Sequence, residues 1–93
     1  MSLASARVIG TSSAVSLVNI NLINAKLTPI QGAGYTVCNL YDGLNNGGSL
    51  IAVLKSSANM TDDFAPSMPI ACTRGLYAEI LGGVETQLTI VYI

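Results

Sequence analysis

The chain has 93 residues, of which 51% are hydrophobic and only 10% are charged, and its formal net charge is −1, whereas an average soluble domain carries about 25% charged residues. Its four cations, Arg7, Lys26, Lys55 and Arg74, are scattered and form no basic stripe for phosphates, so we expect no nucleic-acid partner. Polar residues interrupt every apolar stretch before it reaches the roughly 18 residues that span a bilayer, so we expect no membrane partner.

The N-terminal part of the chain predicts two strands. The first covers residues 7–11, where Gly10 is expected to mark a bulge. The second covers residues 14–25, because apolar residues there alternate with Asn19 and Asn21. This alternation is typical of a strand with one side in the core and one side in water.

The middle of the chain predicts a hairpin. Residues 35–41 follow a loop at 29–34 and have the composition of a strand. Residues 42–48 include three glycines and two asparagines, which tolerate the positive φ angles of tight turns. Residues 50–54 are apolar on both sides, as in a central strand of a sheet that is covered on both faces. A helix over residues 49–60 is the alternative, and we favour the strand because a strong turn signal precedes it.

The last third of the chain predicts a long connection followed by two strands. Residues 56–72 carry two prolines, two adjacent aspartates and little periodicity, which predicts a crossing loop with at most a helical turn at 61–65. Residues 75–80 and 85–93 both alternate, and the Gly82-Gly83 pair between them favours a turn. We therefore predict a C-terminal hairpin.

Together these elements predict an all-β fold, namely a small antiparallel sandwich or barrel of about six or seven strands. A chain of this length supports one hydrophobic core, so residues 1–93 are expected to form a single β domain, with Met1-Ser2-Leu3 a candidate remnant of cloning. The immunoglobulin pattern is disfavoured because tryptophan is absent.

The residues that enzymes commonly use are missing or isolated. The chain has no histidine, which is the commonest general base and metal ligand. Cys38 and Cys72 have no activating neighbour in the sequence. Because we see no export signal, a disulfide between them is not favoured, and we interpret both as reduced core residues. The adjacent Asp62 and Asp63 are expected to point apart. We therefore predict no catalytic activity and no cofactor.

Residues 42–47 partly match a calcium-binding loop. However, Leu44 occupies a ligand position, and Val53 stands where a bidentate glutamate is needed. The glycines of this segment lie inside a hairpin and precede no Lys-Ser or Lys-Thr pair, so they do not match a phosphate-binding loop either. We interpret the segment as a turn and expect no metal site.

The shortage of charge predicts self-association. A net charge near zero gives an isolated monomer little colloidal protection, and the centres of protein interfaces are depleted in charged residues. Tyrosine combines apolar area with a hydroxyl group, and an uncharged C-terminal strand has nothing to deter pairing at its edge. We therefore expect a homo-oligomer whose candidate interface residues are Tyr41, Tyr77, Ile90, Tyr92 and Ile93.

The tyrosines leave two other interpretations open. One is ordinary packing on the surface of a sheet. The other is a binding module for glycans or for a host surface, which would use the tyrosines together with the Asn45-Asn46-Gly47 loop.

The second half of the chain combines four distinctive segments: a Leu40-Tyr41-Asp42-Gly43 turn with a Gly-Gly return, a crossing loop with prolines, Gly75-Leu76-Tyr77-Ala78, and Thr89-Ile90-Val91-Tyr92-Ile93. In these segments, about half of the chain resembles small all-β structural proteins encoded by tailed bacteriophages. The resemblance implies a virion component, such as a capsid decoration protein, a head-tail joining component or a tail protein, commonly a trimer or ring with other virion proteins as partners. It implies no catalytic residue. The expected location is the virion or the cytoplasm of the producing cell.

Overall fold

A computed structural model describes residues 5–29, 36–56, 60–82 and 86–93 of the chain. These residues form no helix and nine strands: β1 (Ser5–Ile9), β2 (Ser13–Ser16), β3 (Ile20–Pro29), β4 (Thr36–Asp42), β5 (Ser49–Ser56), β6 (Asp62–Phe64), β7 (Ile70–Cys72), β8 (Leu76–Gly82) and β9 (Thr86–Tyr92). Several predicted features lie outside the described residues, namely residues 1–3, most of the loop at 29–34, Tyr35, Gly83 and Glu85.

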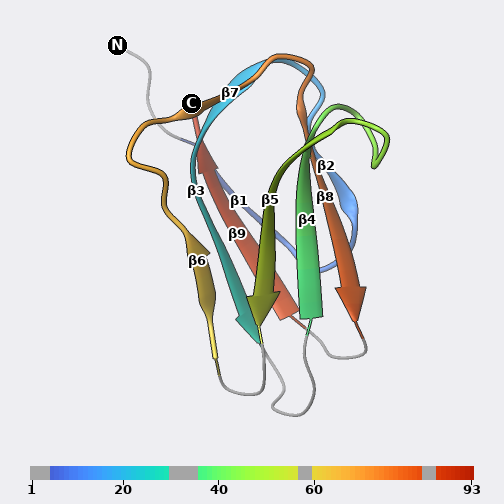
Figure 1. Cartoon of the computed structure of the whole chain (residues 1–93), viewed down its shortest axis with the longest axis vertical. Coiled ribbons are helices and arrows are strands. Elements are labelled where there is room, and N and C mark those ends of the chain that lie inside the picture. The colour runs from blue at the N-terminus through green and yellow to red at the C-terminus, as the bar shows by residue number, and fades with distance from the viewer. Residues whose placement is uncertain (1–4, 30–35, 57–59, 83–85) are drawn as a thin grey trace.

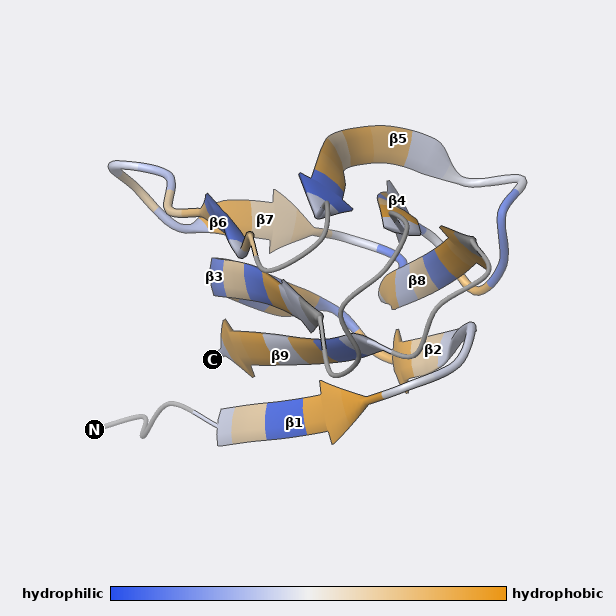
Figure 2. Cartoon of the chain, turned by 90° about the horizontal axis from the view of Figure 1, so that it is seen from below, coloured by the Kyte–Doolittle hydropathy of each residue, from blue (hydrophilic) through white to orange (hydrophobic). Residues whose placement is uncertain are grey.

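The strands form two antiparallel sheets that pack face to face (Figure 1). Sheet A has the strand order β1-β9-β3-β6, with β7 also paired to β3, and sheet B has the order β2-β8-β4-β5. Figure 2 shows the two layers, with β5, β4 and β8 in one and β3, β9 and β1 in the other. The predicted all-β antiparallel sandwich is therefore confirmed, with more strands than the six or seven expected.

The predicted C-terminal hairpin is wrong, although both of its strands are present. β8 pairs with β2 and β4 in sheet B, whereas β9 pairs with β1 and β3 in sheet A. The chain crosses from one sheet to the other between them, and β9 is a central strand. The predicted alternation within β9 is correct, because Leu88 and Ile90 are buried on its inner side while Gln87 is exposed.

Residues 14–25, predicted as one strand, are divided between β2 and β3, which lie in different sheets. β3 has a β-bulge between Leu22 and Asn24 in its pairing with β9. The extra residue shifts the alternation, so that Leu22 and Ala25 both face the core and are fully buried.

Two further segments differ from the prediction. β1 takes the place of the strand expected at 7–11, and Gly10 follows it, so the predicted bulge is wrong. The region 56–72, predicted as a loop with a helical turn at 61–65, contains β6 and β7, and both pair with β3. Strands of three residues are too short to show a period of two.

The central hairpin is confirmed, since β4 and β5 pair antiparallel and residues 50–54 form a strand instead of a helix. β5 is nevertheless an edge strand of sheet B and not the central strand that was predicted. Its outward apolar residues Leu50 and Val53 are therefore exposed.

The hydrophobic core lies between the two sheets. Its buried side chains are Val15, Ile20, Leu22, Ala25, Leu27, Cys38, Leu40, Leu54, Cys72, Leu76, Ala78, Leu88 and Ile90. Both cysteines are unpaired and buried, which confirms their interpretation as reduced core residues. Burial raises the pKa of the Cys38 thiol to about 12 and that of Cys72 to about 11, so both thiols stay protonated at neutral pH and are poor nucleophiles.

Candidate interaction face

The outer side of sheet B is built by alternation in three neighbouring strands. β8, β4 and β5 each place every second residue outward, and their registers align these residues into rows. The rows are Tyr77, Tyr41 and Leu50, then Glu79, Asn39 and Val53, then Leu81, Val37 and Lys55. We call these nine residues face B.

Face B is dominated by apolar and aromatic side chains, which occupy six of its nine positions. Leu50, Val53 and Leu81 are 57%, 44% and 50% exposed, and the tyrosines and Val37 are half-buried. Removing apolar surface from water contributes about 25 cal/mol per Å². A partner that covers this face would therefore gain from the hydrophobic effect.

A hydrogen-bonded cluster around Glu79 lies within face B. The Oε1 atom of Glu79 accepts hydrogen bonds from Asn39 Nδ2 and the Tyr41 hydroxyl, both at 3.2 Å, and Oε2 accepts one from Asn46 Nδ2 at 3.0 Å. These bonds, first that from Asn46, hold the pKa of Glu79 below its ordinary value. Partial burial and the nearby carboxylate raise the pKa of Tyr41. Glu79 is therefore ionised and Tyr41 neutral at physiological pH.

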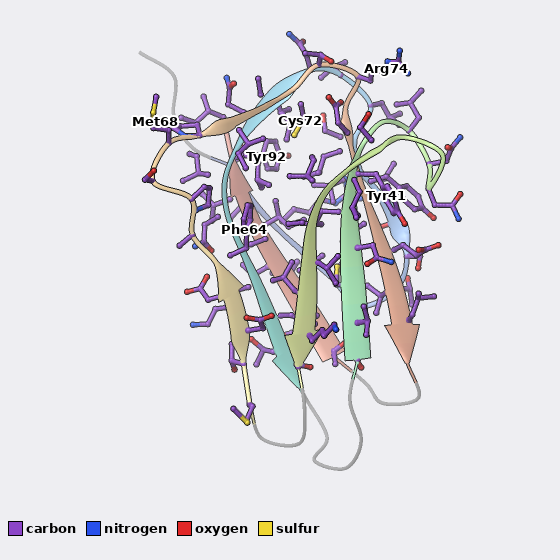
Figure 3. All side chains as sticks on the ribbon, in the orientation of Figure 1. Tyr41, Phe64, Met68, Cys72, Arg74 and Tyr92 are labelled. Atoms are coloured by element: carbon purple, nitrogen blue, oxygen red, sulfur yellow. The ribbon has the colours of Figure 1, made fainter. Side chains whose placement is uncertain are left out.

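Asp42 fastens the end of β4 to the loop that precedes β8. Its Oδ1 atom accepts a hydrogen bond from the Arg74 amide at 2.9 Å, and its Oδ2 atom accepts two from Thr73, at 3.1 Å from the amide and 3.2 Å from the hydroxyl. The Arg74 amide contributes most to lowering the pKa of Asp42. We call these contacts the Asp42 clasp, and Arg74 marks its place in Figure 3.

The residue after the clasp must be glycine. Gly75 has a φ angle of +128°, which side-chain-bearing residues rarely adopt. A Cβ atom at Gly75 would also lie 2.5 Å from the carbonyl oxygen of Ser16. The close approach of the loop before β8 to the end of β2 therefore depends on the absence of a side chain at Gly75.

An open hollow of about 440 Å³ lies at the tip of the β4–β5 hairpin. It is lined by Gly43, Leu44, Asn45, Gly47, Gly48 and Arg74. The Asn45 Oδ1 atom accepts a hydrogen bond from the Gly47 amide at 2.8 Å, which tightens the turn. Because Asn46 in the same loop reaches Glu79, the hairpin tip and face B form one continuous surface.

Two of the five predicted interface residues come together in the structure. Tyr41 and Tyr77 are direct partners across β4 and β8, and both belong to face B. Figure 3 shows Tyr41 at the end of β4 beside the hairpin loop. Ile90, in contrast, is fully buried between the sheets, so its prediction as an interface residue is wrong.

The other two predicted residues lie in sheet A, away from face B. Tyr92 packs against the core from the inner side of β9 (Figure 3). Ile93 is 43% exposed, but its amide and carbonyl both pair with Asn21 at 2.9 Å. The expectation of an open C-terminal edge is therefore wrong, because the backbone of this segment is already paired. An interface role for the side chain of Ile93 stays a prediction.

The outer side of sheet A provides a comparison with face B. Its residues, which we call face A, are Ala6, Val8, Asn24, Lys26, Thr28, Asp63, Gln87, Thr89 and Val91. Most are polar, and Asn24 Nδ2 donates a hydrogen bond to Asp63 Oδ1 at 3.0 Å. The neighbouring Asp62 turns the other way, and its Oδ2 atom accepts a hydrogen bond from the Lys55 amide at 2.8 Å, so the two carboxylates point apart as predicted.

Sequence reasoning missed Glu79, Asn39 and Leu81 as members of the site. Their outward positions follow from the alternation of side chains along β4 and β8, which the sequence predicted as strands at 35–41 and 75–80. What the sequence does not show is that these two strands are neighbours, because β4 and β8 are far apart along the chain.

Comparison with known proteins adds no relative from which a function could be carried over, because no family model and no curated protein sequence matches the chain. Within the described ranges, no group of three or more His, Cys, Asp or Glu side chains could hold a metal ion. The same part of the chain contains no helix that could cross a membrane.

Proposed function

We propose that the protein is a non-catalytic structural assembly protein that acts as a homo-oligomer and uses face B as a contact surface. The observation that carries this proposal is the contrast between the two outer faces, since apolar groups dominate face B and polar groups dominate face A. Exposed apolar side chains gathered on one face are typical of an interaction site. A net charge of −1 leaves little repulsion between copies.

The finer proposal is a component of a bacteriophage virion, such as a capsid decoration, head-tail or tail protein. It rests on the resemblance of the second half of the chain, which also supplies most residues of face B. A protein of this kind needs durable contacts with its neighbours and no reaction site. Other virion proteins are the further partners that this proposal implies.

The test compares one lysine substitution on each face. Leu81 on face B and Val8 on face A are 50% and 53% exposed, so Leu81→Lys and Val8→Lys introduce the same charge at sites of similar exposure. We expect Leu81→Lys to weaken self-association at least about tenfold, because it places a charge in an apolar contact, and Val8→Lys to leave it within about twofold. Size-exclusion chromatography with light scattering at high micromolar concentration measures both. A monomeric wild type, or equal loss in both variants, contradicts the proposal.

A second function, glycan binding, is favoured by the arrangement of Tyr41 and Tyr77 beside the Glu79 cluster. Binding sites for small polar ligands combine aromatic surface with a few fixed polar groups, and here Asn39, Asn46 and Glu79 are fixed by their mutual hydrogen bonds. A glycan array tests it. Specific hits that disappear in the Tyr41→Ala and Tyr77→Ala variants would support this function, and an array without hits would contradict it.

A further inference from the structure

We propose that face B packs on face B of a second copy across a two-fold axis, with Lys55 of each copy opposite Glu79 of the other. This inference rests on the proposed function and goes beyond it, because it specifies the partner, the symmetry and the residues that set the register.

The first argument is the charge pattern of face B. Lys55 and Glu79 are its two charged residues, and they have opposite signs, so the face as a whole is neutral. They lie two strands and two residues apart, which at ordinary strand spacing and rise is a diagonal of about 12 Å between Cα atoms. Face B is therefore able to meet a copy of itself without net repulsion.

The second argument comes from symmetry. In a two-fold contact the same patch faces itself, so a residue pair across the axis is made twice. One possible two-fold axis lies in the plane of the interface and crosses the line between Lys55 and Glu79 at its midpoint and at a right angle. Rotation about this axis places Lys55 of each copy opposite Glu79 of the other copy. An axis along the middle row would instead place Glu79 on Glu79, and like charges in contact across an interface are strongly unfavourable. The charges thus select one register.

The third argument concerns the state of Glu79 before association. Its hydrogen-bond partners Asn39, Asn46 and Tyr41 are neutral donors, so they orient the carboxylate and leave its charge in place. A carboxylate that is already fixed loses little conformational freedom when a cation docks on it. Glu79 is therefore prepared to accept the lysine of a second copy.

The size of face B predicts the strength of the contact. The three strands of face B, with seven or eight residues each, give a flat area of roughly 14 by 24 Å, or on the order of 700 Å² for two copies. This is below the roughly 1,600 Å² of a standard stable interface and in the range of weak, reversible complexes. We expect a pair that dissociates on dilution, and larger assemblies made of an even number of copies.

The test uses two variants that repel themselves and attract each other. In Lys55→Glu, each contact would set the introduced carboxylate against Glu79, and in Glu79→Lys it would set the introduced ammonium group against Lys55. We expect each variant alone to associate at least about tenfold more weakly than the wild type. In an equimolar mixture both contacts again join opposite charges, so we expect a mixed dimer with affinity near that of the wild type, detected by native mass spectrometry and sedimentation velocity.

Two controls keep the result interpretable. Lys26→Glu makes the same charge change on face A, and we expect it to leave association within about twofold of the wild type. Circular dichroism verifies that each variant is folded. If Glu79→Lys does not fold, Glu79→Gln takes its place, because it removes the charge and keeps an acceptor oxygen for the Asn39 and Tyr41 donors. Its mixture with Lys55→Glu should still associate more tightly than Lys55→Glu alone.

The outcomes separate this inference from the proposed function. A wild type that stays monomeric overturns both. A wild-type oligomer that Leu81→Lys dissociates, with no restoration in the mixture of charge variants, overturns the two-fold pairing and leaves the assembly function standing. A trimer or any other odd-numbered assembly also overturns the pairing.

Discussion

Face A and face B are the two outer sides of one sandwich, built by the same alternation, but apolar or aromatic residues occupy six of nine positions on face B and three of nine on face A. On face A the central strands β3 and β9 place Asn, Lys, Thr and Gln residues outward, so that side can remain in water. On face B the central strands β4 and β8 place tyrosine, valine and leucine outward around one carboxylate. The comparison teaches that a sheet can acquire a contact surface without any change to its core, because successive residues point to opposite sides.

The largest expected effect tests the division between the inner and outer sides of sheet A. Ile90→Lys places a lysine among fully buried side chains, and a buried unpaired charge costs more than about 4 kcal/mol. A domain of this size has a total stability of about 5–15 kcal/mol, so we expect the variant to be largely unfolded. The control Thr89→Lys, one residue away on face A, should change stability by about 0.5 kcal/mol or less. Urea unfolding measures both, and a stable Ile90→Lys variant would show that β9 is misplaced.

The next largest effect tests the support that the Asp42 clasp gives to the hairpin beside face B. Gly75→Ala forces a strained φ angle and a clash with the Ser16 carbonyl, which we expect to cost roughly 1–3 kcal/mol. Gly10→Ala is the matched control, because its Cβ atom would have its nearest neighbour at an ordinary 3.5 Å. Thermal unfolding compares the two variants. Equal melting temperatures would mean that the two loops are not held together as described.

A smaller effect concerns the acid sensitivity of the polar groups beside face B. The pKa values of Asp42 and Glu79 are lower in the folded chain than the ordinary values of 3.8 and 4.5. Their stabilising contribution is therefore complete above about pH 5 and is lost as the pH falls through the folded-state pKa values. We expect Asp42→Asn and Glu79→Gln to be less stable than the wild type at pH 7, and the difference to shrink only as the pH falls below the ordinary values of 3.8 for Asp42 and 4.5 for Glu79. Denaturation curves recorded from pH 7 to acidic pH measure this. A difference in stability between variant and wild type that stays constant over this range would contradict the expectation.

The smallest expected effect separates the two tyrosines of face B. Tyr41→Phe removes the hydrogen bond to Glu79, so we expect a small but measurable loss of stability. For Tyr77, the described residues show no hydrogen bond of the hydroxyl group, so Tyr77→Phe should be close to neutral. Chemical denaturation of both variants measures the difference. A larger loss of stability in Tyr77→Phe than in Tyr41→Phe would show that the wrong tyrosine has been assigned to the Glu79 cluster.

The sequence predicts the sides of strands better than their partners. Alternation in residues 75–80 and 85–93 correctly indicates which residues face the core, because it depends only on the strand itself. It does not indicate that β8 and β9 lie in different sheets, and a glycine pair suits a crossing as well as a tight turn. Ile90 was misassigned for the same reason, since an apolar strand without charge can be central or at an edge. Tyr41 and Tyr77 were selected by residue type, but only the pairing of β4 with β8 makes them neighbours.

The central position of β9 in sheet A has a consequence for how the chain acquires its structure during synthesis. A ribosome releases β1 and β3 long before β9, yet these two strands meet only through β9. The β4–β5 hairpin is local and is able to form early, whereas the edges of β1 and β3 that pair with β9 stay unpaired until residues 86–92 have emerged. Newly made chains therefore pass through a stage in which unpaired edges of β1 and β3 are open to chaperones and to neighbouring nascent chains.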